Sequence, residues 1–156
     1  MLPRIEYSVT AQASPEELWA AFCDLSRLLG RGIYSDASWT EGPPWKVGSR
    51  LRYVLAPPVS ATVSAVVTVF EPASKIGLLN HALGITVQQQ VTFTRLNSST
   101  SRVAIVMDSV GESTASPAFD ALDALNFFTK DALDTMLARW EQKKAASVAR
   151  ASGPQP

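Results

Sequence analysis

The sequence predicts an α+β domain in which a curved antiparallel sheet of about seven strands wraps around a long C-terminal helix. Three observations carry this prediction. Residues 116–147 have the apolar spacing of one amphipathic helix, several earlier segments alternate polar and apolar residues, and two short helical segments stand between the first and second strands. A helix with one apolar face needs a large partner, and the sheet supplies it.

The long helix is predicted over residues 116–147. Ser116 and Pro117 supply an N-cap and a first-turn proline. Its apolar residues share one face: Ala118, Phe119, Leu122, Leu125, Leu133, Met136, Leu137 and Trp140. Asn126 and Thr129 lie on the same face, so the surface expected to cover the sheet carries polar groups near its middle.

The first third of the chain changes period several times. Residues 4–10 alternate as a half-buried strand does, and Ser14-Pro15-Glu16-Glu17 is a capping box that begins a short helix running to about Asp24. One or two further helical turns end at Gly30-Arg31-Gly32. Residues 33–39 have no clear period and are predicted to be irregular, and residues 41–48 carry the turn residues of a hairpin loop.

Later segments with the spacing of strands are 49–55, 61–71, 75–81, 85–94 and 102–111. In segment 61–71, one phase holds Val63, Ala65, Val67 and Val69. In segment 85–94, Gln89 shares the phase of Ile85, Val87, Val91 and Phe93. The connections are short enough for neighbouring strands to pair antiparallel.

Length and charge favour one domain with a small-molecule partner. The 156 residues are expected to form a domain over 1–148 and a flexible tail over 149–156. Lys plus Arg and Asp plus Glu both number 14, so no basic excess is available to hold nucleic acid. No apolar run approaches the roughly 18 residues of a membrane span, and no export signal begins the sequence. We expect a cytoplasmic protein, monomeric or homodimeric, without membrane insertion.

No cofactor and no metal site are predicted. Cys23 and His81 are the only cysteine and histidine, and their positions show no ligand spacing. Cys23 is expected to be a small core residue in a reducing compartment. The sequence lacks a nucleophile elbow of the form G-x-S-x-G, and Gly30-Arg31-Gly32 lacks the other residues of a dinucleotide or phosphate loop.

Three stretches resemble markers of a known superfamily. They are Ala13-Ser14-Pro15-Glu16-Glu17-Leu18-Trp19, Trp45-Lys46-Val47-Gly48-Ser49-Arg50-Leu51 and Val69-Phe70-Glu71-Pro72. With the order of elements, they make the chain similar, from Pro3 to about Ser147, to the START-related, Bet v 1-like superfamily (SRPBCC), the polyketide cyclase/dehydrase and lipid transport group. The resemblance implies a helix-grip fold with a cavity between sheet and helix. It implies no catalytic residues, because the superfamily has no shared catalytic motif.

The residues expected to bind a ligand lie on the inward phase of the strands, on the first helix and on the long helix. They are Tyr7, Phe22, Leu51, Tyr53, Val67, Val87, Gln89, Val91, Met107, Leu122, Asn126 and Thr129. An inward amide needs a partner, so Gln89 is expected to bond either within the protein or to a ligand. Tyr7 and Tyr53 either pack in the core or offer hydroxyl groups.

The catalytic candidates are His81, Tyr34, Asp36 and Glu41. His81 is the only side chain expected to titrate near neutral pH without help. The other three lie in the stretch that runs past the cavity mouth in the resembled fold, where burial that raises a carboxyl pKa would provide an acid or base. The alternative for all four is an ordinary solvated side chain.

Three functional hypotheses follow. The first is a protein that binds a small hydrophobic molecule, such as a lipid, polyketide or aromatic compound, in the cavity. The second is a cofactor-independent cyclase or dehydratase that uses acid and base side chains in the same cavity. In the third, side chains fill the hollow, and the protein acts through its surface.

Overall fold

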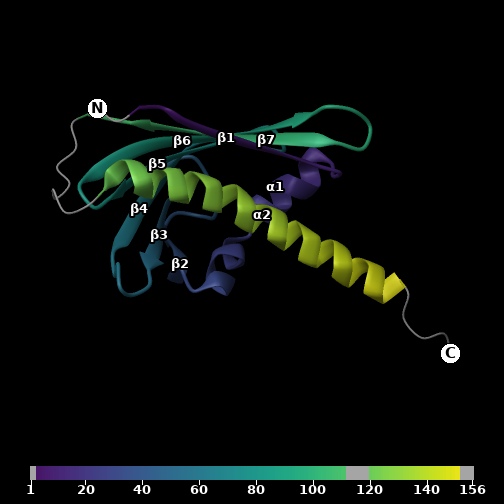
Figure 1. The fold of residues 1–156 in the computed structure, drawn as a ribbon, viewed down its shortest axis with the longest axis horizontal. Helices are drawn as coiled ribbons and strands as arrows, with labels where there is room; N and C mark the ends of the chain where they lie inside the picture. The colour runs from purple at the N-terminus through teal and green to yellow at the C-terminus, as the bar shows by residue number, and fades with distance from the viewer. Residues whose placement is uncertain (1–2, 112–119, 152–156) are drawn as a thin grey trace.

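The computed structural model describes residues 3–111 and 120–151. Its elements are β1 (Ile5–Ala11), α1 (Pro15–Cys23), the 3₁₀ helix η1 (Leu25–Arg31), β2 (Tyr34–Glu41), β3 (Arg50–Leu55), β4 (Thr62–Glu71), β5 (Lys75–Ala82), β6 (Ile85–Arg95), β7 (Ser101–Ser109) and α2 (Ala121–Ala151). Seven strands form one antiparallel sheet in the order β1-β7-β6-β5-β4-β3-β2 (Figure 1). The predicted fold class is therefore confirmed.

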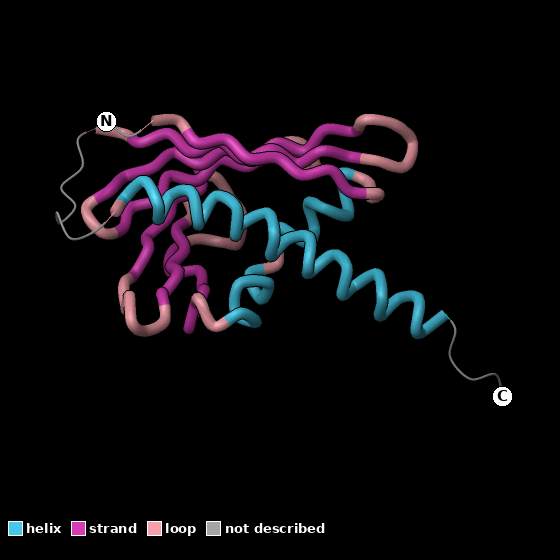
Figure 2. Tube along the Cα trace, viewed as in Figure 1, coloured by secondary structure: helices cyan, strands magenta, loops and turns pink. Residues whose placement is uncertain are grey.

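Helix α2 packs on the sheet with its first half and extends beyond the strands with its second (Figure 2). Leu125, Thr129, Leu133 and Met136 are buried, whereas the side chains of residues 141–150 are exposed. The helix continues to Ala151, past its predicted end at Ser147. The predicted N-cap and the first two apolar residues of the predicted face, at positions 116–119, lie outside the described residues.

The first turns of α2 face the sheet with a different side from the one the sequence predicted. Leu122 is 37% exposed, and Asn126 is exposed and donates its amide to the Leu122 carbonyl. The side that faces inward here holds Ala124, Leu125 and Phe128. At 100° per residue, Leu122 and Asn126 point roughly 100° or more away from the centre of that arc. The expectation that these two side chains face the hollow is therefore wrong.

Strand β2 occupies the segment that was predicted to be irregular. It pairs with β3, but the register shifts between Tyr34 and Asp36 and again between Trp39 and Glu41. Each shift interrupts the alternation of inward and outward side chains. A strand of eight residues with two interruptions shows no period of two in its sequence.

Strand β4 contains one extra residue opposite β5. Val67 pairs with Leu78 and Val69 pairs with Gly77, so Thr68 is the residue without a counterpart. The bulge changes the phase of the strand: Ala65 and Val67 are buried as predicted, but beyond the bulge Phe70 packs on the core in place of Val69. A Cβ at Gly77 would lie 2.7 Å from Thr68 Oγ1, so the bulge fits closely against a glycine.

Helix α1 begins as the sequence predicts. Ser14 Oγ accepts a hydrogen bond from the Glu17 backbone N–H at 3.1 Å. The Glu17 carboxylate accepts a 2.9 Å hydrogen bond from Trp140 Nε1, which links α1 to α2. Within residues 3–111 and 120–151, no helix has a stretch both long and apolar enough to cross a membrane.

Replacing Leu133 with alanine should lower the free energy of unfolding by about 2–5 kcal/mol, because this side chain is fully buried between α2 and the sheet. Urea denaturation followed by circular dichroism measures the change. Val148→Ala is the matched control, since Val148 lies on the same helix and is 58% exposed; it should change stability by less than about 0.5 kcal/mol. Equal losses of unfolding free energy in the two variants would contradict the described packing of α2 on the sheet.

Candidate functional site

A pocket of about 110 Å³ lies between the concave face of the sheet and the first half of α2. Its apolar wall includes Phe22, Leu28, Leu55, Leu78, Val87, Met107, Leu125 and Phe128. Six polar or charged residues also border it: Arg27, Tyr34, Tyr53, Asn80, Gln89 and Asp131. The site is therefore an apolar hollow with a few polar groups in its wall, as is usual for small-molecule pockets.

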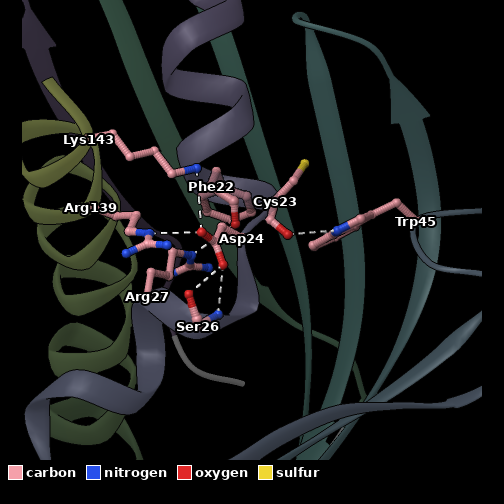
Figure 3. Close-up of polar contacts among 8 residues, drawn as sticks. All are labelled: Phe22, Cys23, Asp24, Ser26, Arg27, Trp45, Arg139 and Lys143. Atoms are coloured by element: carbon pink, nitrogen blue, oxygen red, sulfur yellow. Dashed lines mark hydrogen bonds and ion pairs between the residues drawn. The ribbon is translucent and has the colours of Figure 1, made fainter. Parts of the chain in front are cut away.

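Aromatic rings fill the other end of the space between sheet and helices. Phe70, on β4, lies 4.7 Å from Trp19 and 5.9 Å from Trp45 between ring centroids. Trp19 also contacts Phe93 at 5.4 Å, and Trp45 Nε1 donates to the Cys23 carbonyl at 2.9 Å (Figure 3). None of these four rings lines the pocket, whose own aromatic residues are Phe22, Tyr34, Tyr53 and Phe128.

Arg27 is a buried cation in the pocket wall. Its Nε donates to the Phe22 carbonyl at 2.9 Å, and its Nη1 donates to Thr135 Oγ1 at 2.8 Å and to the Ala132 carbonyl at 3.3 Å. Its guanidinium also lies 4.4 Å from the centroid of the Phe22 ring. Burial lowers the pKa of Arg27, but an arginine stays protonated in proteins. Arg27 therefore ties the end of α1 to the middle of α2.

Asp24 holds the 3₁₀ helix that carries Arg27 (Figure 3). Its Oδ1 accepts from the Ser26 backbone N–H at 3.0 Å and from Ser26 Oγ at 2.6 Å, and its Oδ2 accepts from Arg139 Nε at 2.8 Å. Lys143 Nζ lies 3.4 Å from the same Oδ2. Burial acts to raise the pKa of Asp24, but the hydrogen bonds from Ser26 and Arg139 outweigh it and lower the pKa to about 2. Asp24 thus fixes η1 against α2.

Asp131 brings a buried carboxylate to the pocket from α2. It is 5% exposed, and its Oδ1 accepts from Arg31 Nη1 at 3.1 Å. Burial raises the pKa of Asp131, against the opposing effect of Arg31 and Arg27. The pocket therefore contains a carboxyl group that holds a proton more readily than one in water.

Two tyrosines complete the polar side of the pocket. The rings of Tyr34 and Tyr53 lie 5.9 Å apart, and Tyr34 also contacts Phe128 at 6.3 Å. Burial raises the pKa of Tyr53 to about 12 and raises that of Tyr34 further. Both hydroxyl groups are therefore protonated donors at neutral pH.

Gln89 faces the hollow as its strand phase predicted. Its Oε1 accepts a 3.0 Å hydrogen bond from Asn80 Nδ2 on the neighbouring strand. This is the bond within the protein that was one of the two expected alternatives. Both amides border the pocket, so the pair also presents polar groups to its contents.

The expected ligand-binding residues divide by position along the sheet. Those that border the pocket are Phe22, Tyr53, Val87, Gln89 and Met107. Those on the core face but away from the pocket are Tyr7, Leu51, Val67, Val91 and Thr129. Strand phase tells which face a side chain is on and not which end of the face is open. Leu122 and Asn126, as described above, do not face the interior.

Three of the four catalytic candidates lie on the surface. His81 Nδ1 is 2.8 Å from Thr86 Oγ1, and Asp36 and Glu41 form exposed ion pairs with Arg52 and Arg50. These three have the solvated role that was their alternative. Tyr34 alone borders the pocket.

Arg27 and Asp131 border the pocket although neither was predicted from the sequence to do so. A signal for Arg27 was present, because it interrupts the apolar spacing of Leu25, Leu28 and Leu29 in a short helical segment. Asp131 had the ordinary appearance of an acidic residue in the first half of a helix. Asp131 lies two residues after Thr129, which was expected to face inward, and this spacing did not predict that Asp131 is buried.

The paired Cys23 and His81 expectations concern metal ligands and a core thiol. Among residues 3–111 and 120–151, no three His, Cys, Asp or Glu side chains are grouped as metal ligands. Cys23 is a free thiol, and burial raises its pKa to about 12. It therefore stays protonated and weakly nucleophilic near neutral pH.

Neither a family model nor a curated protein matches the sequence. Solved structures do match. The Zhui aromatase/cyclase from Streptomyces sp. R1128 is 14% identical with a TM-score of 0.72, covering 90% of this chain and 94% of that one. A START superfamily protein from Mycobacterium smegmatis is 12% identical with a TM-score of 0.69, covering 89% and 97%. Ara h 8.0201 is 10% identical with a TM-score of 0.70, covering 90% and 98%.

Identities this low show a common fold. The seven-stranded sheet, the pair of helices between β1 and β2, and the long α2 together define the helix-grip fold. This chain has the fold of the START-related, Bet v 1-like superfamily, as its fold markers indicated.

Replacing Asp24 with asparagine should lower the free energy of unfolding at pH 7 by about 1–2 kcal/mol. The folded-state pKa of about 2 is below that of an unfolded aspartate, so the ionised group stabilises the fold above about pH 4. This contribution is lost as the pH falls through 2. Urea denaturation at pH 7 and pH 3 should show a smaller difference between variant and wild type at pH 3.

Asp36→Asn is the control for this experiment, because Asp36 forms an exposed pair with Arg52. It should change stability by less than about 0.5 kcal/mol at both pH values. An Asp24→Asn effect that stays constant between pH 7 and pH 3 would contradict the role assigned to the Asp24 carboxylate.

Proposed function

We propose that this protein binds a small apolar molecule in the pocket between the sheet and the first half of α2. The observation that carries the proposal is the pocket itself, which has an apolar wall built from α1, η1, α2 and five strands. Water in such a space makes few hydrogen bonds to the wall. Its replacement by an apolar ligand therefore lowers the free energy of the system.

The volume limits the size of the guest. Ligand pockets usually measure about 300–1,000 Å³, and an apolar cavity of about 150 Å³ is enough for benzene. The pocket here, at about 110 Å³, is smaller than both, so a single ring or a short branched chain fits with a small outward movement of the pocket side chains. A lipid or a multi-ring polyketide requires α2 or the pocket side chains to move apart.

The structural neighbours support a general ligand-binding or cyclase role without choosing a ligand. One is described as an aromatase/cyclase and another as a START superfamily protein. The location that we propose is the cytoplasm, because the chain has a single cysteine that stays free.

A second candidate function is catalysis of the cyclase or dehydratase kind. Its specific support is that Asp131, a carboxyl group with a raised pKa, borders the same pocket as the Tyr34 hydroxyl group. An aldol closure followed by loss of water needs a base for the carbon acid and an acid for the departing hydroxyl. We propose Asp131 as the base and Tyr34 as the acid for these two steps.

Toluene should bind the protein saturably in isothermal titration calorimetry, and Ala132→Met should weaken that binding at least about tenfold. Ala132 borders the pocket, so the longer side chain takes up its volume. Ala146→Met is the matched control, because Ala146 lies on the exposed part of the same helix. Equal toluene affinity in the two variants would refute binding in this pocket.

The catalytic candidate is tested with a short linear poly-β-ketone incubated with the protein and followed by mass spectrometry. A cyclised product lighter by one water should form faster with the wild type than with Asp131→Asn, by about a hundredfold or more. Equal rates in wild type and variant, or in wild type and buffer, would remove this function. That result would not bear on the first proposal, which toluene binding tests separately.

A further inference from the structure

Three hydrogen-bond donors at the pocket lack acceptors. Arg27 Nη2 and the hydroxyl groups of Tyr34 and Tyr53 make no hydrogen bond within the part of the chain that the structure describes. Every fully buried side-chain nitrogen and oxygen in that part does have a partner. These three atoms are therefore not fully buried, and their residues all border the pocket.

The charged residues of the pocket wall are one cation, Arg27, and one carboxylate, Asp131. Arg27 is 8% exposed and has no carboxylate within 4 Å among residues 3–111 and 120–151. The nearby carboxylate of Asp131 is bonded to Arg31, so two arginines face one carboxylate. Burial of a guanidinium with an unused N–H group and no counter-ion raises the free energy of the folded protein. An anion or an oxygen acceptor that bonds to this N–H group removes that penalty.

We infer that the pocket binds a small apolar molecule with one carboxylate group, of the size and kind of a single-ring aromatic acid. This inference rests on the proposed function and names the chemical class of its ligand. The carboxylate accepts hydrogen bonds from Arg27 Nη2 and the two tyrosine hydroxyl groups, and the ring packs on Leu78, Val87 and Leu125. Because Arg31, outside the pocket wall, pairs with Asp131, the ligand carboxylate pairs with Arg27, the remaining cation of this cluster.

The tyrosines suit this role because they remain donors over a wide pH range. Burial raises the pKa of Tyr53 to about 12 and raises that of Tyr34 as well, so neither hydroxyl becomes an anion that repels a carboxylate. Asp131 is the one group of the wall with the wrong sign. Arg31 compensates for it at 3.1 Å, and burial favours its protonated form.

Calorimetric titrations with benzoate, benzamide and toluene at pH 7 test the inference. Benzamide has nearly the shape of benzoate without its charge, and toluene has neither charge nor acceptor. Benzoate should bind at least about tenfold more tightly than benzamide, since charged hydrogen bonds contribute more than neutral ones. Benzamide affinity equal to or above benzoate affinity, with toluene still bound, would overturn the inference and leave the proposed function standing.

Variants identify the donors. Arg27→Met should remove the preference for benzoate over benzamide, and Tyr53→Phe should reduce it by about threefold to tenfold. Tyr53→Phe keeps every bond that Arg27 makes to α1 and α2, so it remains informative if Arg27→Met fails to fold. Arg52→Met, an exposed arginine on the same strand as Tyr53, should leave the preference unchanged.

Asp131→Asn separates charge from simple packing. Removing the opposing carboxylate should strengthen benzoate binding relative to toluene binding, because toluene carries no charge. Weaker benzoate binding in this variant, or equal losses in Arg27→Met and Arg52→Met, would overturn the assignment of the anion to Arg27. If none of the three probes binds the wild-type protein, the proposed function fails together with this inference.

Discussion

The packing of α2 on the concave face of the sheet is the constraint on which the rest of the structure depends. Leu133 and Met136 are fully buried there and fix the middle of the helix. The N-terminal turns lie over the pocket, with Leu125 and Phe128 in its wall. The position of the helix therefore decides both the stability of the domain and the size of its hollow.

Arg27 joins stability and binding in one side chain. Two of its nitrogens hold α1 and α2 together through Phe22 and Thr135, and the third has no hydrogen-bond partner among residues 3–111 and 120–151. Buried cations that serve structure alone are normally satisfied on all sides by the protein. Arg27 is satisfied on two sides and borders the pocket, which distinguishes it from the exposed ion pairs on the outer face of β2 and β3.

The sequence predicted the parts of the fold that repeat regularly. Alternation in β6 placed Gln89 inward, and the N-cap at Ser14 began α1 where expected. The errors fall where regularity stops. Register shifts hid β2, and the bulge at Thr68 moved Phe70 inward. The site was harder, because which end of the concave face stays open depends on how side chains from several elements fill space together, and sequence period does not contain that information.

The bulge in β4 decides which side chain fills one end of the interior. The one additional backbone position turns Phe70 toward Trp19 and Trp45, and the three rings close that half of the interior. Regular pairing of the same residues, without the bulge, would aim Val69 inward instead of Phe70. The aromatic packing at this end of the interior therefore depends on one local backbone irregularity as well as on which residues the strand contains.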